Sequence, residues 1–343
     1  MSEERARSEG AVDGRPGSGA DSLTLVEAVG EGLRAAMEAH DDVVVLGEDV
    51  GRNGGVFRAT EGLWEAFGDD RVIDTPLAES GIVGAAIGLA LSGLRPVAEL
   101  QFMGFSYPAF DQIVSHAARM RYRTGSRYTC PIVVRMPFGA GVSAPEHHSE
   151  SKEAFFAHEP GLKVVAPATP YDAKGLLLAS IRDPDPVIVL EPKRLYRSFR
   201  EDVPAGDYEV PIGEAAVRRE GEDVSVFTWG ASTRPAIEAA ERLAGDVDVE
   251  VVDLRTVSPL DRAAIVASFE KTGRAVVVHE APKSAGVGAE ISALLDEEAL
   301  LRQEAPIKRI AGPDTPVPMH ALEEHYLPDA ERIVAGIRET ADF

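Results

Sequence analysis

The stretch "DTPLAESGIVGAAIGLALSGLRPVAELQF", residues 74–102, places one carboxylate between two unlike segments. Glu79 follows a short strand-like run and precedes a segment of Gly, Ala, Ile and Leu that predicts a long, apolar helix from Ser80. An acid in the first turn of a helix interacts well with the helix dipole and needs no other role. Alternatively, a carboxylate held among apolar residues has a raised pKa and can share a proton with a ligand. The local sequence leaves both interpretations open.

Helix and strand patterns alternate on both sides of this stretch. Residues 23–39 predict a helix capped by Ser22, and one helix is predicted from Pro108 to about Tyr122. Between the helices lie short apolar runs such as "VVVLGED" and "PIVVRMP". This alternation indicates a mainly parallel sheet with helices on both faces. A second, smaller series from "VSVFTWG" to "IKRI" has the same rhythm, so the predicted fold class is α/β with two domains.

Composition divides the chain further. We predict a flexible acidic tail at 1–22, a first domain at 23–200, a linker at 201–212 and a second domain at 213–343. The tail is polar and Gly-rich and lacks the apolar core of a secretory signal. The predicted linker continues a stretch of prolines and charges that interrupts the alternation.

Charge and cysteine content exclude several classes of protein. The formal net charge of −22 disfavours nucleic acid as a partner, because phosphates would be repelled. No apolar run reaches the roughly 20 residues that span a bilayer. The single cysteine, Cys130, rules out an intrachain disulfide framework and fits a reducing cytoplasm. The acidity indicates either adaptation to high salt or an ordinary acidic protein, and the sequence leaves both open.

Short motifs for common chemistries are absent. The sequence has no G-x-x-x-x-G-K-[ST], no G-x-G-x-x-G after a strand and no G-x-S-x-G. The run "EHHSES", residues 146–151, holds two adjacent histidines, whose side chains would diverge on a helix. A zinc site, a catalytic loop histidine and a plain surface pair are therefore all compatible with the spacing.

Longer blocks carry a resemblance to a known family. "LGEDVG", "VIDTPLAESGIVGAAIGLA", "RPVAELQF", "PAFDQIVSHAARMRYRTG", "HHSESKEAFFAHEPGLKVVAPATPYDAKGLL" and "DPVIVLEPK" occur in one order, followed by "VVDLRTVSPLD" and "VVVHEAP". Together they resemble the beta subunit of the thiamine-diphosphate-dependent 2-oxo acid dehydrogenase component, of the pyruvate and branched-chain type. The likeness covers Leu23 to Pro328. It implies a pyrimidine-binding domain of the transketolase type followed by a transketolase C-terminal domain.

The resemblance also implies roles for particular residues. It places Glu79 on the aminopyrimidine of thiamine diphosphate, where a carboxyl group bonded to ring nitrogen N1′ favours the imino tautomer that activates the cofactor. Leu77, Gln101 and Phe105 would contact the same ring. His148 would assist acyl transfer to a lipoyl group or orient the substrate carboxylate.

Two further positions near His148 depend on the same resemblance. The neighbouring His147 is the second choice for the catalytic histidine, because relatives vary there. Glu150 stands where many relatives carry glutamine, and an acid close to His148 would raise the pKa of that histidine.

Relatives also hold a structural potassium ion. The matching positions here are Ile132, Ser180, Asp183 and Asp185. Asp185 replaces an asparagine that is common in the family. The run "DPDP" is equally typical of a plain turn, so the sequence leaves open whether these residues form an ion site or a turn.

The sequence lacks a signature for the diphosphate half of the cofactor. It has no G-D-G, and its one asparagine is Asn53. The resemblance implies that magnesium and the diphosphate are held by an alpha subunit in an α2β2 heterotetramer, and that a lipoyl-bearing acyltransferase core accepts the acyl group. Pyruvate, branched-chain 2-oxo acids and acetoin remain open as substrates. The alternative to an enzyme subunit is a catalytically silent scaffold or regulatory subunit with the same fold.

Overall fold

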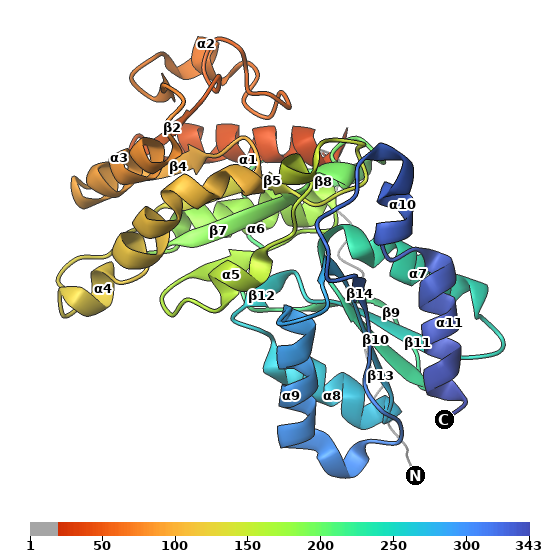
Figure 1. Cartoon of the computed structure of the whole chain (residues 1–343). Coiled ribbons are helices and arrows are strands. Elements are labelled where there is room, and N and C mark those ends of the chain that lie inside the picture. Colours follow the sequence, from red (N-terminus) through yellow and green to blue (C-terminus); the bar gives the residue numbers. More distant parts are fainter. Residues whose placement is uncertain (1–19) are drawn as a thin grey trace, which may run out of the picture.

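The computed structural model describes residues 20–343, which form two α/β units on separate sheets (Figure 1). The predicted fold class is thereby confirmed. Residues 1–19, most of the predicted tail, lie outside the described residues. The end of that tail belongs to β1 (Ala20–Leu23), which pairs antiparallel with β8 (Glu201–Pro204) from the predicted linker. In the described part of the chain, no helix is long and apolar enough to cross a membrane.

The first unit is built on a seven-stranded sheet with the order β12-β6-β7-β5-β4-β2-β3. All neighbours are parallel except β12, which runs antiparallel to β6 at the edge. Valine-rich strands fit this sheet because helices cover both of its faces. The strands are β2 (Val43–Gly47), β3 (Val72–Asp74), β4 (Arg95–Glu99), β5 (Val133–Phe138), β6 (Lys163–Val165), β7 (Val187–Pro192) and β12 (Thr256–Ser258).

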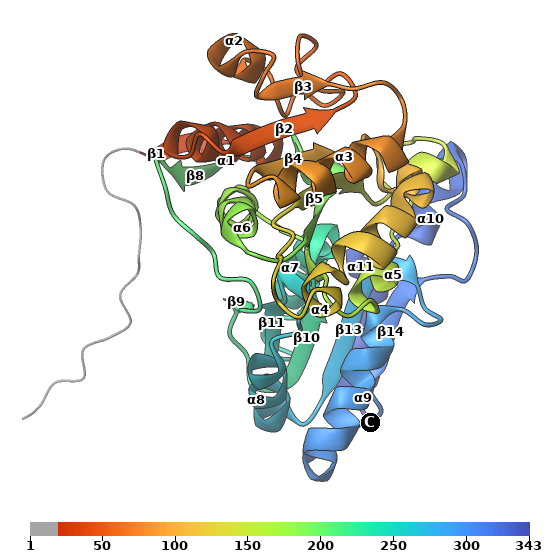
Figure 2. The ribbon, with the colours of Figure 1, turned by 90° about the vertical axis from the view of Figure 1, so that its left-hand side faces the viewer.

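The helices of this unit form two layers (Figure 2). On one face α1 packs against α6, and on the other α3 packs against the irregular helices η1 and η2. The helices are α1 (Leu25–Ala39), α2 (Leu63–Phe67), α3 (Glu79–Leu91), η1 (Met103–Ala109), η2 (Gln112–Ala117), α4 (Met120–Arg123), η3 (Glu146–His148), α5 (Glu153–Ala157), α6 (Pro170–Arg182) and η4 (Lys193–Leu195).

Two local predictions for these helices are wrong. Thr24, not Ser22, caps α1: its hydroxyl accepts from the Glu27 N–H, and the Glu27 carboxylate accepts from the Thr24 N–H at 2.8 Å. Ser22 lies in β1. The single helix predicted over 108–122 is broken into 3-10, π and α segments. In the folded chain η1 packs against both α3 and η3, and η2 also packs against α3.

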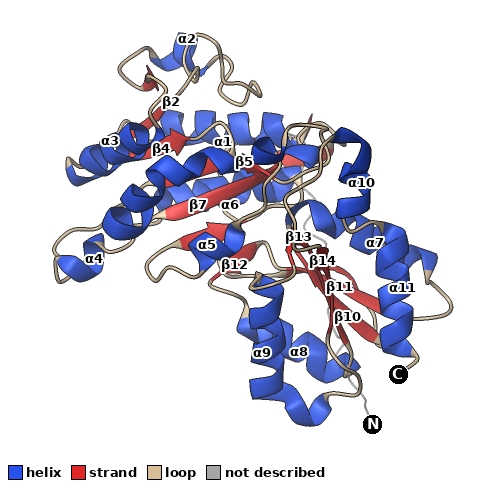
Figure 3. Cartoon of the chain, viewed as in Figure 1, coloured by secondary structure: helices blue, strands red, loops and turns tan. Residues whose placement is uncertain are grey.

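The second unit has a five-stranded sheet with the order β14-β13-β10-β11-β9, in which only β9 is antiparallel (Figure 3). Its strands are β9 (Ala216–Arg219), β10 (Val224–Thr228), β11 (Val249–Asp253), β13 (Ala275–Pro282) and β14 (Lys308–Gly312). Its helices are η5 (Gly230–Ser232), α7 (Thr233–Arg242), α8 (Arg262–Thr272), α9 (Val287–Ala299), η6 (Leu300–Arg302), η7 (His320–Leu322), α10 (Glu323–Tyr326) and α11 (Ala330–Ala341).

Charged side chains and a shared core join the two units. Asp172 in α6 is fully buried and pairs with Arg218 and with Arg255, the latter at 2.9 Å. Arg218 also binds the buried carboxylate of Asp253 at 2.8 Å. One apolar core continues from α3 through β10 to α9. Because β12 also completes the first sheet, the second unit is part of the framework of the first.

A buried arginine links the central strands of the first sheet. Arg135 in β5 is 1% exposed, and its guanidinium binds both oxygens of Glu191 in β7 at 2.7 Å. It also pairs with Glu99 in β4, on its other side. Burial raises the pKa of Glu99, although the charge of Arg135 opposes the change. The Tyr196 hydroxyl donates to Glu191 at 2.5 Å and completes the cluster.

Replacing Arg135 by methionine should lower the free energy of unfolding by about 3–5 kcal/mol, because two buried carboxylates lose their partner. Arg135→Lys keeps the charge but loses the two-pronged geometry, so its loss should be smaller. The matched control is Arg119→Met, which breaks an exposed pair with Glu159 and should cost about 0–1 kcal/mol. Thermal unfolding followed by circular dichroism measures all three, and equal losses for Arg135→Met and the control would contradict the assignment.

Candidate active site

The predicted catalytic residues follow the carboxyl ends of neighbouring parallel strands. Glu79 follows β3, Gln101 and Phe105 follow β4, and His148 follows β5. In the sheet, β3, β2, β4 and β5 are successive neighbours. Open α/β sheets bind ligands at this edge, where the loops after the strands converge. The topology therefore gathers these residues along one edge of the first unit.

Glu79 is the first residue of α3 and is half-buried. Buried side chains such as Ile82 fix the helix against the sheet, so the position of Glu79 is set by packing. A second acid lies near it: burial and the negative charges of Glu79 and Asp49 raise the pKa of Glu48. Carboxylates from the loops after β2 and β3 thus share this part of the edge, a grouping that the sequence alone does not indicate.

Aromatic rings surround His148. Its ring centroid lies 4.4 Å from that of Phe102 and 5.1 Å from that of Phe105, both in edge-on geometry. The ring of His147 is 4.2 Å away. Edge-to-face contacts favour one ring orientation. The structure thus brings Phe105 and His148 together, and it adds Phe102, which the sequence reasoning missed although it precedes Phe105 in the same "QFMGF" run.

The other two predicted cofactor contacts lie at the edge of this group. Gln101 is half-buried and donates to the Asp49 carboxylate at 3.3 Å. Leu77 is 78% exposed in the loop before α3 and is available to a ligand or to another chain. Between Glu79 and His148 stands η1, which packs against both α3 and η3. The candidate site thus extends along the carboxyl ends of the strands, and its aromatic residues lie at η1.

The pKa of His148 is lowered, mainly because the ring is partly desolvated and further because of the nearby charges of His147 and Lys193. The imidazole therefore stays neutral to lower pH than an exposed histidine. The acid at Glu150 has the opposite predicted effect, but its carboxylate is bound to the Tyr107 hydroxyl at 2.5 Å and is not among the causes of the shift. The rise in the pKa of His148 that was expected if Glu150 lay close to it is therefore not seen.

Lys193 is a buried residue of the site that the sequence did not reveal. Its ammonium donates to the carbonyl of Gly139 at 2.6 Å and to that of His148. It also lies 5.5 Å from the ring centroid of Phe102. Burial lowers the pKa of Lys193 to about 8. The only signal in the sequence is a lysine directly after a buried strand, which is also common on surfaces.

The positions predicted for potassium lie at the opposite edge of the sheet. Ile132 precedes β5, and its carbonyl accepts from the Val187 N–H at 3.0 Å. The Ser180 carbonyl accepts from the Asp183 N–H at 3.3 Å. Asp185 binds Arg121 at 2.7 Å, and Asp183 pairs with Lys163. Among residues 20–343, no cluster of three or more His, Cys, Asp or Glu forms a metal site, and the potassium site stays a prediction.

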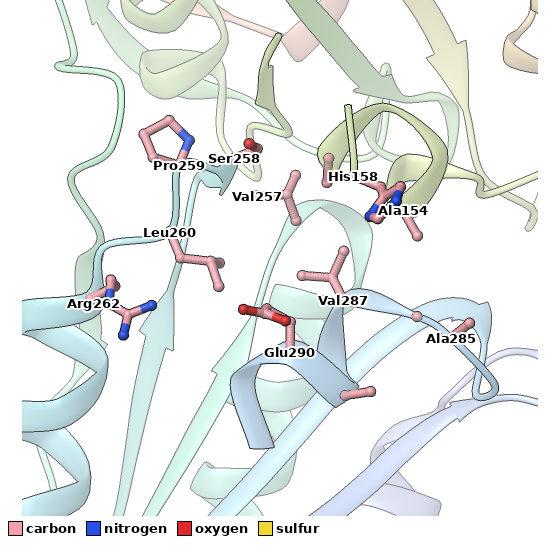
Figure 4. A pocket seen from close by; sticks show the side chains of 13 residues that line it. Ala154, His158, Val257, Ser258, Pro259, Leu260, Arg262, Ala285, Val287 and Glu290 are labelled. Carbon is pink, nitrogen blue, oxygen red and sulfur yellow. The ribbon is translucent and has the colours of Figure 1, made fainter. Parts of the chain in front are cut away.

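A separate cavity of about 540 Å³ lies between the two units (Figure 4). Val257, Ser258 and Pro259 line it from one side, and Val287 and Glu290 of α9 line it from another. None of the predicted site residues lines it. The cavity therefore does not belong to the edge that holds Glu79 and His148.

Comparisons with protein families match both parts of the chain. Residues 21–198 match the family "Transketolase, pyrimidine binding domain". Residues 213–333 match the family "Transketolase, C-terminal domain". The first match includes every predicted site residue, from Leu77 to Asp185.

Individual proteins are similar over nearly the whole chain. The chain is 52% identical over 322 residues to the pyruvate dehydrogenase E1 component subunit beta of Bacillus subtilis and 53% identical over 322 residues to that of Staphylococcus aureus. Each alignment covers 94% of this chain and 99% of the relative. Among solved structures, a split gene transketolase described as an inactive beta4 tetramer has a TM-score of 0.75 and is 22% identical in sequence. The match covers 94% of this chain and 99% of that chain. At that identity the likeness shows the fold.

Titration of His148 should have its midpoint below that of an exposed histidine, because burial and neighbouring positive charge disfavour the imidazolium. His147→Asn should raise the midpoint, since one of these charges is lost. Glu150→Gln is the matched control and should leave the midpoint in place, because Glu150 is not among the groups that shift the pKa of His148. Nuclear magnetic resonance of the histidine-labelled chain measures all three, and a downward move in Glu150→Gln would show that the acid does act on His148.

Proposed function

Because the chain belongs to the family of beta subunits of the thiamine-diphosphate-dependent 2-oxo acid dehydrogenase component, we propose that it supplies half of an active site for oxidative decarboxylation of a 2-oxo acid. The substrate that we propose is pyruvate, since the relatives described above are pyruvate dehydrogenase subunits. The single observation that supports the proposal most is the placing of Glu79, Phe105 and His148 along one carboxyl edge. Branched-chain 2-oxo acids and acetoin stay as predictions for the same site.

The residues of this edge fit an aminopyrimidine ring. When bound, thiamine diphosphate supplies the nucleophilic carbon and the electron sink that decarboxylation needs. Glu79, half-buried at a helix start, would exchange a proton with ring nitrogen N1′. The ring of Phe105 would provide an apolar wall, with Gln101 and the exposed Leu77 beside it.

His148 fits a role in proton transfer to or from the acyl group. Its Nδ1 is buried and has no hydrogen-bond partner among the described residues, and its lowered pKa keeps the ring able to accept a proton near neutral pH. We propose that it assists transfer of the acyl group to the lipoyl arm of an acyltransferase core, or orients the substrate carboxylate.

The diphosphate must be held from elsewhere, since the sequence has no G-D-G and one asparagine, Asn53. We therefore propose an alpha subunit that binds the diphosphate through magnesium, in an α2β2 heterotetramer. The exposed Leu77 and the open edge beside it are suited to contact with that subunit. The potassium positions Ile132, Ser180, Asp183 and Asp185 are proposed only as a structural site, remote from the chemistry.

Reconstitution tests the shared site. The assay follows pyruvate-dependent reduction of an artificial electron acceptor in the presence of thiamine diphosphate and magnesium. Activity should appear only when this chain is mixed with its alpha subunit, because neither chain by itself would hold a complete cofactor site. The assay should run from low to molar salt, given the net charge of −22. Parallel reactions with 3-methyl-2-oxobutanoate and acetoin compare the substrates. Equal activity without the alpha subunit would overturn the shared site, and silence in every mixture would favour a catalytically silent subunit.

Glu79→Gln should lower kcat in the mixture by about 10²- to 10⁴-fold, since the amide cannot exchange the proton that the carboxylate exchanges. The matched control is Glu65→Gln, an exposed acid in α2, which should leave kcat within twofold of the wild type. Size-exclusion chromatography checks that both variants still assemble. A fully active Glu79→Gln enzyme would remove Glu79 from the proposed mechanism.

A further inference from the structure

One loop of the first unit is held by charged side chains that converge from three directions. It runs from Gly139 to Ser151, between β5 and α5, and carries His148 in η3. Its ends are tied together, because the Gly139 N–H donates to the Glu150 carbonyl at 2.9 Å. From the first unit, Lys193 binds the carbonyls of Gly139 and His148.

The second unit contributes two buried carboxylates. Glu323, the first residue of α10, is 4% exposed; its Oε1 accepts from the Gly141 N–H at 2.7 Å and its Oε2 from the Ser143 N–H at 2.8 Å. Glu280 in β13 is also buried; its Oε2 accepts from the Ala140 N–H at 3.2 Å and from the Ser151 hydroxyl at 3.3 Å. Figures 1 and 2 both show α10 beside this loop.

The loop backbone is shaped for these contacts. Gly139 has a φ of +86°, and a Cβ there would lie 2.6 Å from Oε2 of Glu280. Gly141 has a φ of +93°, and a Cβ there would lie 2.4 Å from Cδ of Arg194. Glycine is therefore needed at both positions for conformation and for space. A small apolar cluster that includes Ala140 of the loop and Tyr326 of α10 packs the loop against the second unit.

Resting on the proposed function, we propose that Glu280 and Glu323 of the second unit are positioning residues that fix His148 through the backbone of the loop 139–151. Within residues 20–343, neither carboxylate forms a hydrogen bond with a ring of the site. Glu323 accepts from two backbone N–H groups of the loop at 2.7 and 2.8 Å, distances typical of charge-assisted bonds. Glu280 accepts from one backbone N–H and from the Ser151 hydroxyl at 3.2 and 3.3 Å. The second α/β unit thereby holds a loop of the active site in the first unit. The hydrogen-bonded residues are 140 and 182 positions apart in the sequence.

The two glutamates differ in a way that makes the proposal testable. Glu323 uses both oxygens as acceptors for two N–H groups, so Glu323→Gln must set an amide NH₂ against one of them. Glu280 makes both bonds through Oε2, and its Oε1 has no partner among the described residues. Glu280→Gln can therefore keep both bonds through its amide oxygen, whereas Glu280→Leu loses them.

Kinetics of the complex with its alpha subunit give the first test. Glu323→Gln and Glu280→Leu should lower kcat by about 10- to 100-fold, the scale of a 1 Å displacement of a catalytic group, with KM for pyruvate within about threefold. Glu280→Gln should retain much more of kcat than Glu280→Leu. Glu324→Gln, at the exposed acid next to Glu323, is the matched control and should match the wild type. Equal losses for Glu280→Gln and Glu280→Leu would overturn the role of Glu280.

A double-variant cycle separates positioning from general destabilisation. In a His148→Ala background, Glu323→Gln should lower kcat no further than about twofold, because its effect passes through that side chain. The same loss in both backgrounds would overturn the proposal.

Amide hydrogen exchange tests the contacts without any activity. Exchange in 139–151 should be faster in Glu323→Gln than in Glu324→Gln, while peptides from α1 and α6 stay unchanged. Unchanged exchange in the loop would overturn the proposal even if the enzyme were inactive. If the wild-type mixture has no activity, the proposed function fails, while the exchange result still decides whether Glu323 holds the loop. If Glu323→Gln does not fold, the two Glu280 variants decide the same question.

Discussion

The guanidinium of Arg135 lies between two carboxylates in the middle of the first sheet, and the placing of the site depends on it. Glu99, Arg135 and Glu191 stand on the successive strands β4, β5 and β7, from which the loops of the site depart. A buried charge is tolerated only when it is paired and hydrogen-bonded, so this cluster favours the arrangement in which the three strands are neighbours. Tyr196, which directly follows the 3-10 helix η4 after β7, donates into the same cluster.

From this layer the chain departs into the loops of the site. The loop after β4 brings Phe102 and Phe105, the loop after β5 brings His148, and the segment after β7 brings Lys193. Lys193 then returns to the loop of His148 through two backbone carbonyls. The order of strands in the sheet therefore becomes the order of functional groups along its edge, which is why parallel sheets carry their chemistry there.

Much of this arrangement was predictable from local patterns. Short apolar runs alternating with helical patterns indicated the α/β class. A strand covered on both faces is apolar throughout, whereas a helix that covers a sheet is apolar on one side only. A helix from Ser80 was predicted from the change to a Gly/Ala-rich run, and α3 begins one residue earlier, at Glu79. Phe105 and His148 were found through ordered blocks of family resemblance, and the structure places their rings 5.1 Å apart. The helix cap is a local feature that was nevertheless missed, since Ser22 and Thr24 are both good caps and pairing of β1 with β8 decides between them.

The sequence by itself determined most of the helices and strands, because backbone sterics and apolar periodicity act over a few residues; the pairing of β1 with β8 and the division of the 108–122 segment needed the tertiary structure. Only the tertiary structure decided which charged residues are buried. Arg135, Lys193 and Glu323 are of residue types that usually lie at the surface, and although Arg135 lies within an apolar strand and Lys193 follows one, the sequence does not show which partner each of them meets. Their partners lie 36 to 182 residues away. A charge leaves water only when such a partner meets it with matching geometry, and that match exists only once the sheets and the two units have packed together.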